Sequence, residues 1–97
     1  MESSSLPSVE IEYCRRCRFQ LRAAWLAQEI LGTFEDNLSS VALVPSGGGI
    51  LEIRVDEEVV ASNRDGAPMP DVSDVKRAIR DRVAPERRIG HESESEN

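Results

Sequence analysis

Two cysteines separated by two residues are the groups in this sequence best suited to chemistry. Cys14 and Cys17 lie in the stretch VEIEYCRRCRFQLRAAW, and the 97-residue chain has no other cysteine. Such a pair can form a redox-active disulfide, supply two metal ligands, or remain as inert reduced thiols. A zinc site usually needs four ligands, so zinc would require a dimer that shares four thiolates.

The position of the pair favours redox chemistry. Residues 8–13 alternate between apolar and polar side chains, which predicts a half-buried strand, and a helical pattern runs from about Cys17 to Phe34. At the start of a helix, unpaired N–H groups and the helix dipole stabilise a thiolate. We therefore expect Cys14 and Cys17 to be the catalytic residues.

Positive charge is concentrated around the pair. The chain carries 12 basic and 18 acidic residues, and four of its arginines fall within eight positions: Arg15, Arg16, Arg18 and Arg22. Cations at a helix N-terminus oppose the dipole, although a solvated helix start could carry them. We expect them to serve the thiolate, an anionic thiol substrate such as glutathione, or an acidic partner protein.

The overall composition excludes several classes of function. A net charge of −6 argues against nucleic acid or an anionic membrane as the main partner. No segment approaches the roughly 20 apolar residues that span a bilayer, and the first residues do not resemble a signal peptide. We expect a cytoplasmic protein, where a purely structural disulfide does not persist.

The rest of the chain predicts the elements that position the pair. Strand patterns cover residues 39–45, 50–55 and 59–62, and a second helix, capped by Asp71, covers 72–83. The order β-α-β-β-β-α predicts an α/β fold, a two-layer α+β sandwich with a four-stranded mixed sheet and both helices on one face. Alternating charges predict that the other face meets water. We expect residues 8–85 to form the domain, between a disordered segment 1–7 and a charged tail 86–97.

Two further residues are candidates for binding. Gly49 lies in PSGGGI, where a phosphate-binding loop is disfavoured because a strand follows rather than a helix. Gly49 would instead let a substrate backbone approach the thiols closely. The alternative is that Gly49 only makes the start of the hairpin flexible. Trp25 falls with Arg22 on the polar side of the first helix, either packed under arginine side chains or as a candidate partner surface.

Three segments together resemble a known family. EYCRRCRFQLRAAWLAQEILGTF, VALVPSGGGILEIRVDEEVV and VKRAIRDRVAPERRIGH are similar to the prokaryotic cysteine-containing members of the selenoprotein W/T/H family, also called Rdx. The likeness covers roughly residues 8 to 91. It implies a thioredoxin-like fold and a thiol oxidoreductase role, with glutathione linkage in some members.

The resemblance bears on which cysteine attacks. Selenocysteine occupies the second position of the pair in the selenoprotein members, where this chain has Cys17, and this favours Cys17 as nucleophile. The predicted geometry favours Cys14, as the more exposed thiol before the helix. We expect Cys14 to attack and Cys17 to resolve the mixed disulfide.

The sequence thus predicts a small thiol–disulfide oxidoreductase that needs no bound cofactor and no metal. Its expected substrates are thiols or disulfides of proteins or glutathione, and we expect a monomer or a weak homodimer. One alternative is a redox-sensitive adaptor that binds a protein partner without turnover. Another is a dimer bridged by zinc through the shared thiolates of Cys14 and Cys17.

Overall fold

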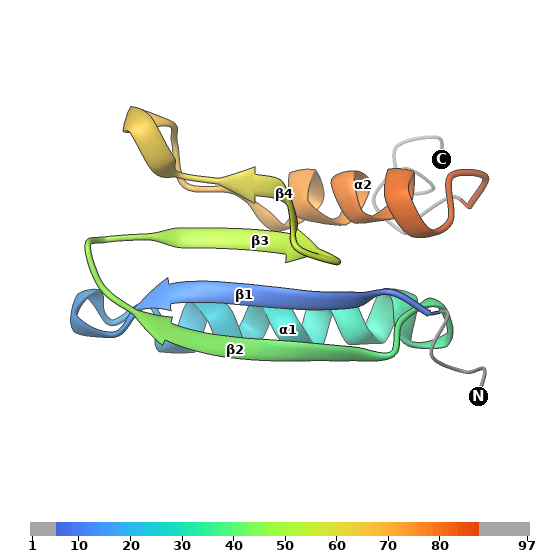
Figure 1. Ribbon diagram of the computed structural model, residues 1–97, viewed down its shortest axis with the longest axis horizontal. Helices are drawn as coiled ribbons and strands as arrows, with labels where there is room; N and C mark the ends of the chain where they lie inside the picture. Colours follow the sequence, from blue (N-terminus) through green and yellow to red (C-terminus); the bar gives the residue numbers. More distant parts are fainter. Residues whose placement is uncertain (1–5, 88–97) are drawn as a thin grey trace, which may run out of the picture.

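A mixed four-stranded sheet carries two helices on one of its faces (Figure 1). The computed structural model describes residues 6–87. The strands are β1 (Ser8–Cys14), β2 (Ser40–Ser46), β3 (Leu51–Val55) and β4 (Glu58–Ser62). The helices are α1 (Gln20–Phe34) and α2 (Val72–Val83), and the 3-10 turns are η2 (Arg15–Cys17), η3 (Glu35–Asn37) and η4 (Arg64–Gly66). The predicted fold class and element order are confirmed.

The sheet topology brings four chain segments to one edge. The strand order is β2-β1-β3-β4, with β1 parallel to β2, and β3 antiparallel to both of its neighbours. The carboxyl ends of β1, β2 and β4 therefore meet the amino end of β3, at the left of Figure 1. Residues that follow or precede these ends come close together although they are far apart in the sequence.

The core lies between the sheet and the helices. Alternate residues of β1 face alternate residues of β3 in register, as Val9 faces Val55 and Ile11 faces Ile53. α1 packs against β1 and β2, and α2 packs against β3 and β4. The helices contribute Ala23, Leu26, Ile30, Phe34, Val75 and Ile79, all fully buried. Burial of this apolar surface is the main force that holds the two layers together.

The first helix begins later than the sequence pattern indicated. α1 starts at Gln20 rather than near Cys17. Arg18 adopts a left-handed backbone conformation with φ 61°, which ends η2 and separates it from α1. The cysteine pair therefore lies in its own turn, ahead of the helix. By contrast, α2 begins as predicted, with the Asp71 carboxylate accepting a hydrogen bond from the Asp74 N–H at 3.0 Å.

The open face of the sheet is not simply solvated, as the alternating charges had suggested. Glu12 and Glu52 face each other across β1 and β3, and Glu52 is only 3% exposed. The Arg54 guanidinium lies between them, 2.9 Å from Glu12 and 2.8 Å from Glu52. Arg64 donates to the other Glu52 oxygen at 2.5 Å. Two like charges in register would repel, so these arginines are what allow the carboxylates to face each other.

The expected disordered start and charged tail lie largely outside the described residues. Pro7 is described, and its carbonyl accepts a hydrogen bond from the Ser39 N–H at 2.8 Å, which ties the start of β1 to β2. Within residues 6–87, no helix has the length and apolar character that a membrane span requires.

Candidate active site

The two thiols lie together where β1 ends. Cys14 is the last residue of β1, Cys17 closes η2, and their side chains form a hydrogen bond with each other. Cys14 is 2% exposed, whereas Cys17 is exposed. The prediction that Cys14 is the more exposed thiol is therefore wrong. Cys14 remains part of the sheet, where its N–H donates to the Ile50 carbonyl at 2.8 Å, while η2 carries Cys17 outward.

Hydrogen bonds shift the pKa values of the two thiols in opposite directions. The pKa of Cys14 is lowered, first by a hydrogen bond from the Cys17 thiol and then by the backbone N–H groups of Gly49, Arg16 and Cys17, which outweigh burial. The pKa of Cys17 is raised, because its proton is held in the bond to Cys14 and because of burial and the charge of the Cys14 thiolate. Cys14 is therefore the thiol that loses its proton first, and the Cys17 thiol stabilises the negative charge that results.

Exposure and pKa thus point to different cysteines. The lowered pKa favours a thiolate at Cys14, whereas only Cys17 is accessible from solvent. Accessibility decides which sulfur meets a substrate, because thiol–disulfide exchange requires direct contact between the attacking sulfur and the disulfide. The lowered pKa of Cys14 describes instead how its neighbours stabilise a negative charge on the inner sulfur.

The glycine loop, residues 47–49, includes Gly49, the candidate binding residue from the sequence. The backbone N–H of Gly49 lowers the pKa of both cysteines, so it is directed at the pair. Gly49 has φ 74° and Gly48 has φ 72°. Only glycine adopts this left-handed conformation without steric cost, which explains why the loop that supplies the amide consists of glycine.

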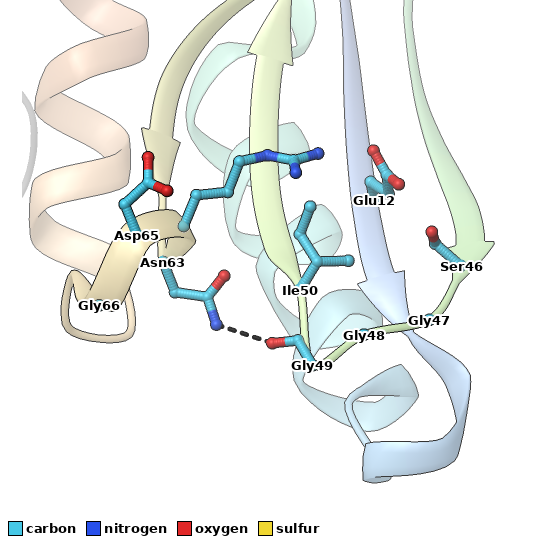
Figure 2. A pocket seen from close by; sticks show the side chains of 10 residues that line it. Glu12, Ser46, Gly47, Gly48, Gly49, Ile50, Asn63, Asp65 and Gly66 are labelled. Atoms are coloured by element: carbon cyan, nitrogen blue, oxygen red, sulfur yellow. Dashed lines mark hydrogen bonds between the residues drawn. The ribbon is translucent and has the colours of Figure 1, made fainter.

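Asn63 holds this loop in place, a role that the sequence analysis missed. It follows β4, and its side-chain NH2 group donates to the Gly49 carbonyl at 2.8 Å (Figure 2). Its side-chain oxygen accepts a hydrogen bond from the Leu51 N–H at 2.9 Å. Its own N–H donates to the Leu51 carbonyl at 3.2 Å. In the sequence, Asn63 is a single asparagine in the loop SNRDGAP. Asparagine in a loop usually stabilises a local turn, so its presence alone did not indicate a contact with the glycine loop.

The glycine loop also lines a polar pocket of about 480 Å³ (Figure 2). Gly49 lines it, as do Glu12, Ser46 and Arg64. The pKa of Glu12 is lowered, first by a hydrogen bond from Ser46 and then by Arg54. The pocket therefore presents a carboxylate and a guanidinium beside the backbone that supports the thiols.

The side chains of the arginines near the pair are exposed, and their positive charges are not a main cause of the thiol pKa shifts. The main causes of the thiol pKa shifts are the two cysteines themselves, burial and backbone N–H groups, without any arginine charge. Within residues 6–87, no carboxylate forms an ion pair with Arg15, Arg16, Arg18 or Arg22. Their charges are thus available to a substrate or a partner.

The outer side of α1 carries exposed apolar side chains. Trp25 is 46% exposed, which agrees with the helical register that placed it opposite the core. Leu21, one turn earlier, is 80% exposed and was not singled out from the sequence. Among the described residues, no group of three His, Cys, Asp or Glu side chains could hold a metal ion.

The fold and the cysteine pair define a class, the thioredoxin-like proteins with a CxxC pair at the end of the first strand. Within that class, the model of the Rdx family matches residues 8–81, and the chain belongs to this family.

Two solved structures are similar to this chain. A crystal structure of a protein from Bordetella parapertussis has 37% sequence identity and a TM-score of 0.76, covering 80% of this chain and 99% of that one. A selenoprotein W-related protein from Vibrio cholerae has 36% identity and a TM-score of 0.74, covering 79% and 96%. Among curated proteins, none matches this chain.

Proposed function

We propose that this protein is a thiol–disulfide oxidoreductase that reduces disulfides with the thiols of Cys14 and Cys17. The observation that carries the proposal is the mutual hydrogen bond between one exposed and one buried thiol, with a backbone amide directed at both. An inert pair has no need of such polar contacts, and membership of the Rdx family supports a redox-related role.

Cys17 is the attacking thiol in this proposal. Its proton passes along the existing hydrogen bond to Cys14, and the Cys17 thiolate attacks one sulfur of the substrate disulfide. The substrate S–S bond breaks, a mixed disulfide forms, and the other substrate sulfur leaves as a thiolate. This reverses the assignment that we expected from the sequence, because Cys14 is buried.

Cys14 is the resolving thiol. After losing its proton to solvent or to the departing thiolate, Cys14 attacks Cys17 in the mixed disulfide. The second substrate thiolate leaves, and a Cys14–Cys17 disulfide remains. Two electrons have moved from the cysteine pair to the substrate. The N–H of Gly49 stabilises negative charge on either sulfur during both steps.

The pocket beside the glycine loop suits a small disulfide with charged ends. Glu12 and Arg64, which also pair with Arg54 and Glu52, bring charges of both signs to the lining of a 480 Å³ space. Oxidised glutathione carries ammonium and carboxylate groups that match them. We include glutathione among the proposed substrates, together with protein disulfides.

Trapping with single-cysteine variants tests the proposal. The reduced wild-type protein is mixed with oxidised glutathione, and the intact mass is recorded over time. We expect Cys14→Ser to accumulate a stable mixed disulfide at Cys17, and the wild type to proceed to an intramolecular disulfide. Cys17→Ser should react far more slowly, because its remaining thiol is buried.

Two results would count against this assignment. A mixed disulfide that forms rapidly in Cys17→Ser but not in Cys14→Ser would make Cys14 the nucleophile. The absence of reaction with glutathione and with any other disulfide would favour the redox-sensitive adaptor. Metal analysis of the purified protein checks the zinc-bridged dimer separately, because that species needs one zinc for every two chains.

A further inference from the structure

The outer face of α1 carries large apolar side chains among its polar ones. Leu21 is the most exposed large hydrophobic side chain among the described residues at 80%, and Trp25 is 46% exposed. The helix buries Ala23, Leu26 and Ile30 on its opposite side, so neither Leu21 nor Trp25 is needed for the core. Residues four apart on a helix are neighbours, and these two side chains form one surface.

This surface lies close to the exposed thiol. Leu21 is four residues beyond Cys17, and Trp25 is one helical turn, about 5.4 Å along the axis, beyond Leu21. Cys17 closes the turn that leads into this helix. A macromolecule that contacts Leu21 and Trp25 is therefore within reach of the Cys17 sulfur.

Unpaired positive charge borders the same side chains. Arg18 precedes Leu21 by three residues and Arg22 follows it directly. Both arginines are exposed, and neither forms an ion pair within residues 6–87. In contrast, Arg54, Arg64 and Arg77 all contact carboxylates. The chain as a whole carries a net charge of −6, so this cationic region differs from the rest of the molecule. Complementary charge orients and accelerates protein encounters.

We infer that a protein substrate binds to the α1 docking surface, which consists of Arg18, Leu21, Arg22 and Trp25. The reactive disulfide of this substrate has acidic side chains and an apolar side chain next to it. The inference rests on the proposed function and identifies the kind of protein substrate. Two apolar side chains suit the small interface of a transient redox encounter, which buries less than about 1,200 Å². Tryptophan and arginine are the residues most often found to dominate such contacts.

A second copy of this chain does not fit the same surface. In a two-fold symmetric dimer, the surface would meet itself, and the arginines of one copy would face those of the other. Like charges brought together in this way oppose association. An acidic partner has no such conflict.

Synthetic peptides provide the test. The acidic peptide contains one cysteine with glutamates and leucines next to it. The basic peptide has the same sequence with each glutamate replaced by lysine. Each is prepared as a mixed disulfide with thionitrobenzoate. Cys17 attacks the peptide sulfur and releases thionitrobenzoate, and Cys14 then displaces the peptide thiol. The cysteine pair is oxidised, the mixed disulfide is reduced to two thiols, and the released colour gives the rate.

We expect the acidic peptide to react about tenfold faster than the basic one, with the difference shrinking as salt is added. Leu21→Ser, Trp25→Ala and Arg22→Gln should each slow the acidic peptide several-fold. The same variants should reduce bis(2-hydroxyethyl) disulfide, a small neutral substrate, at the wild-type rate. Val59→Ser and Arg77→Gln are matched controls, since Val59 is 47% exposed on β4 and Arg77 lies on α2, and they should change neither rate.

Equal rates for the two peptides, unchanged by Leu21→Ser and Trp25→Ala, would overturn the docking inference and leave the proposed function intact. If the wild type fails to reduce even the small disulfide, the proposed function fails, and docking is then decided by fluorescence. Trp25 is the only tryptophan, so an acidic peptide with serine in place of cysteine should shift its emission and protect it from acrylamide. An emission spectrum that does not respond to this peptide overturns the inference by itself.

Discussion

The side-chain amide of Asn63 donates a hydrogen bond to the Gly49 carbonyl at 2.8 Å. The peptide N–H of Gly49, on the other side of its Cα, is directed at the two thiols. The end of β4 thereby holds the backbone that supports the cysteine pair. Asn63 touches no reacting atom, so it is a positioning residue.

Replacement of Asn63 should change the pKa of Cys14, although Asn63 does not contact the thiols. We expect Asn63→Ala to lower the free energy of unfolding by about 1–3 kcal/mol, because the Leu51 N–H and the Gly49 carbonyl lose their partner. The pKa of Cys14 should rise as the Gly49 N–H becomes less well placed. Denaturant unfolding and thiolate absorbance against pH measure the two effects. Asn37→Ala, in η3 at the opposite end of the sheet, is the control, and an identical thiol titration in both variants would refute the role of Asn63.

A methyl group at Gly49 should destabilise the protein through the backbone. Gly49→Ala places a side chain in the left-handed region at φ 74°, which costs about 1–2 kcal/mol, although a Cβ there meets nothing within 4 Å. Gly32→Ala is the matched control within α1. It should stabilise the protein by about 0.5–1 kcal/mol, since alanine favours the helix and its Cβ also meets nothing. Thermal unfolding of both variants measures the difference, and a Gly49→Ala protein as stable as the wild type would show that the loop adopts another conformation.

Two substitutions at Cys17 should distinguish the effect of its hydrogen bond on Cys14 from the effect of losing its thiol. Cys17→Ala removes the donor that does most to lower the pKa of Cys14, so that pKa should rise. Cys17→Ser keeps a hydroxyl donor at the same position and should leave the pKa of Cys14 closer to its wild-type value. Both variants lose the thiol that we propose as the nucleophile. Thiolate absorbance against pH gives the titrations, and identical curves for the two variants would mean that Cys17 is not the donor.

Acid should weaken the fold through Glu12 and Glu52. The folded-state pKa of each is lowered from 4.5: for Glu12 by Ser46 and Arg54, and for Glu52 by Arg64, Ser62 and Arg54, against the opposing effect of burial. Because these pKa values are lower in the folded state than in the unfolded state, the two carboxylates stabilise the fold fully above about pH 4.5. This stabilisation is lost as the pH falls through the folded-state pKa values. Unfolding free energy measured against pH should therefore decline below about pH 4.5.

Glu52→Gln tests this origin of the acid sensitivity. The variant should be less stable than the wild type at neutral pH, because a neutral amide cannot satisfy both Arg54 and Arg64, and its stability should fall less on acidification. Glu57→Gln, on the exposed turn between β3 and β4, is the control and should follow the wild-type profile. An unchanged acid profile in Glu52→Gln would assign the effect to other carboxylates.

Local residue patterns were enough to predict the strands, the helices and the cysteine pair that we propose as the reactive site. Local periodicity predicted the strands and helices, Asp71 marked the start of α2, and the CxxC spacing identified Cys14 and Cys17. These features depend on residues close in the chain, because side-chain periodicity and helix capping involve residues within one or two helical turns of each other. The start of α1 was the exception, because the left-handed Arg18 leaves no signal in the hydrophobic pattern.

The tertiary structure alone decided which thiol is exposed and what surrounds the pair. Cys14 is buried because it pairs with Ile50, Gly49 is held by Asn63, and Glu52 is covered by arginines from β3 and η4. Each of these contacts depends on how the strands pair and where their ends meet. An alternating pattern shows which residues share a face, but it does not show which distant segment lies over that face. The role that we propose for each cysteine therefore depends on strand pairing rather than on the spacing of the pair.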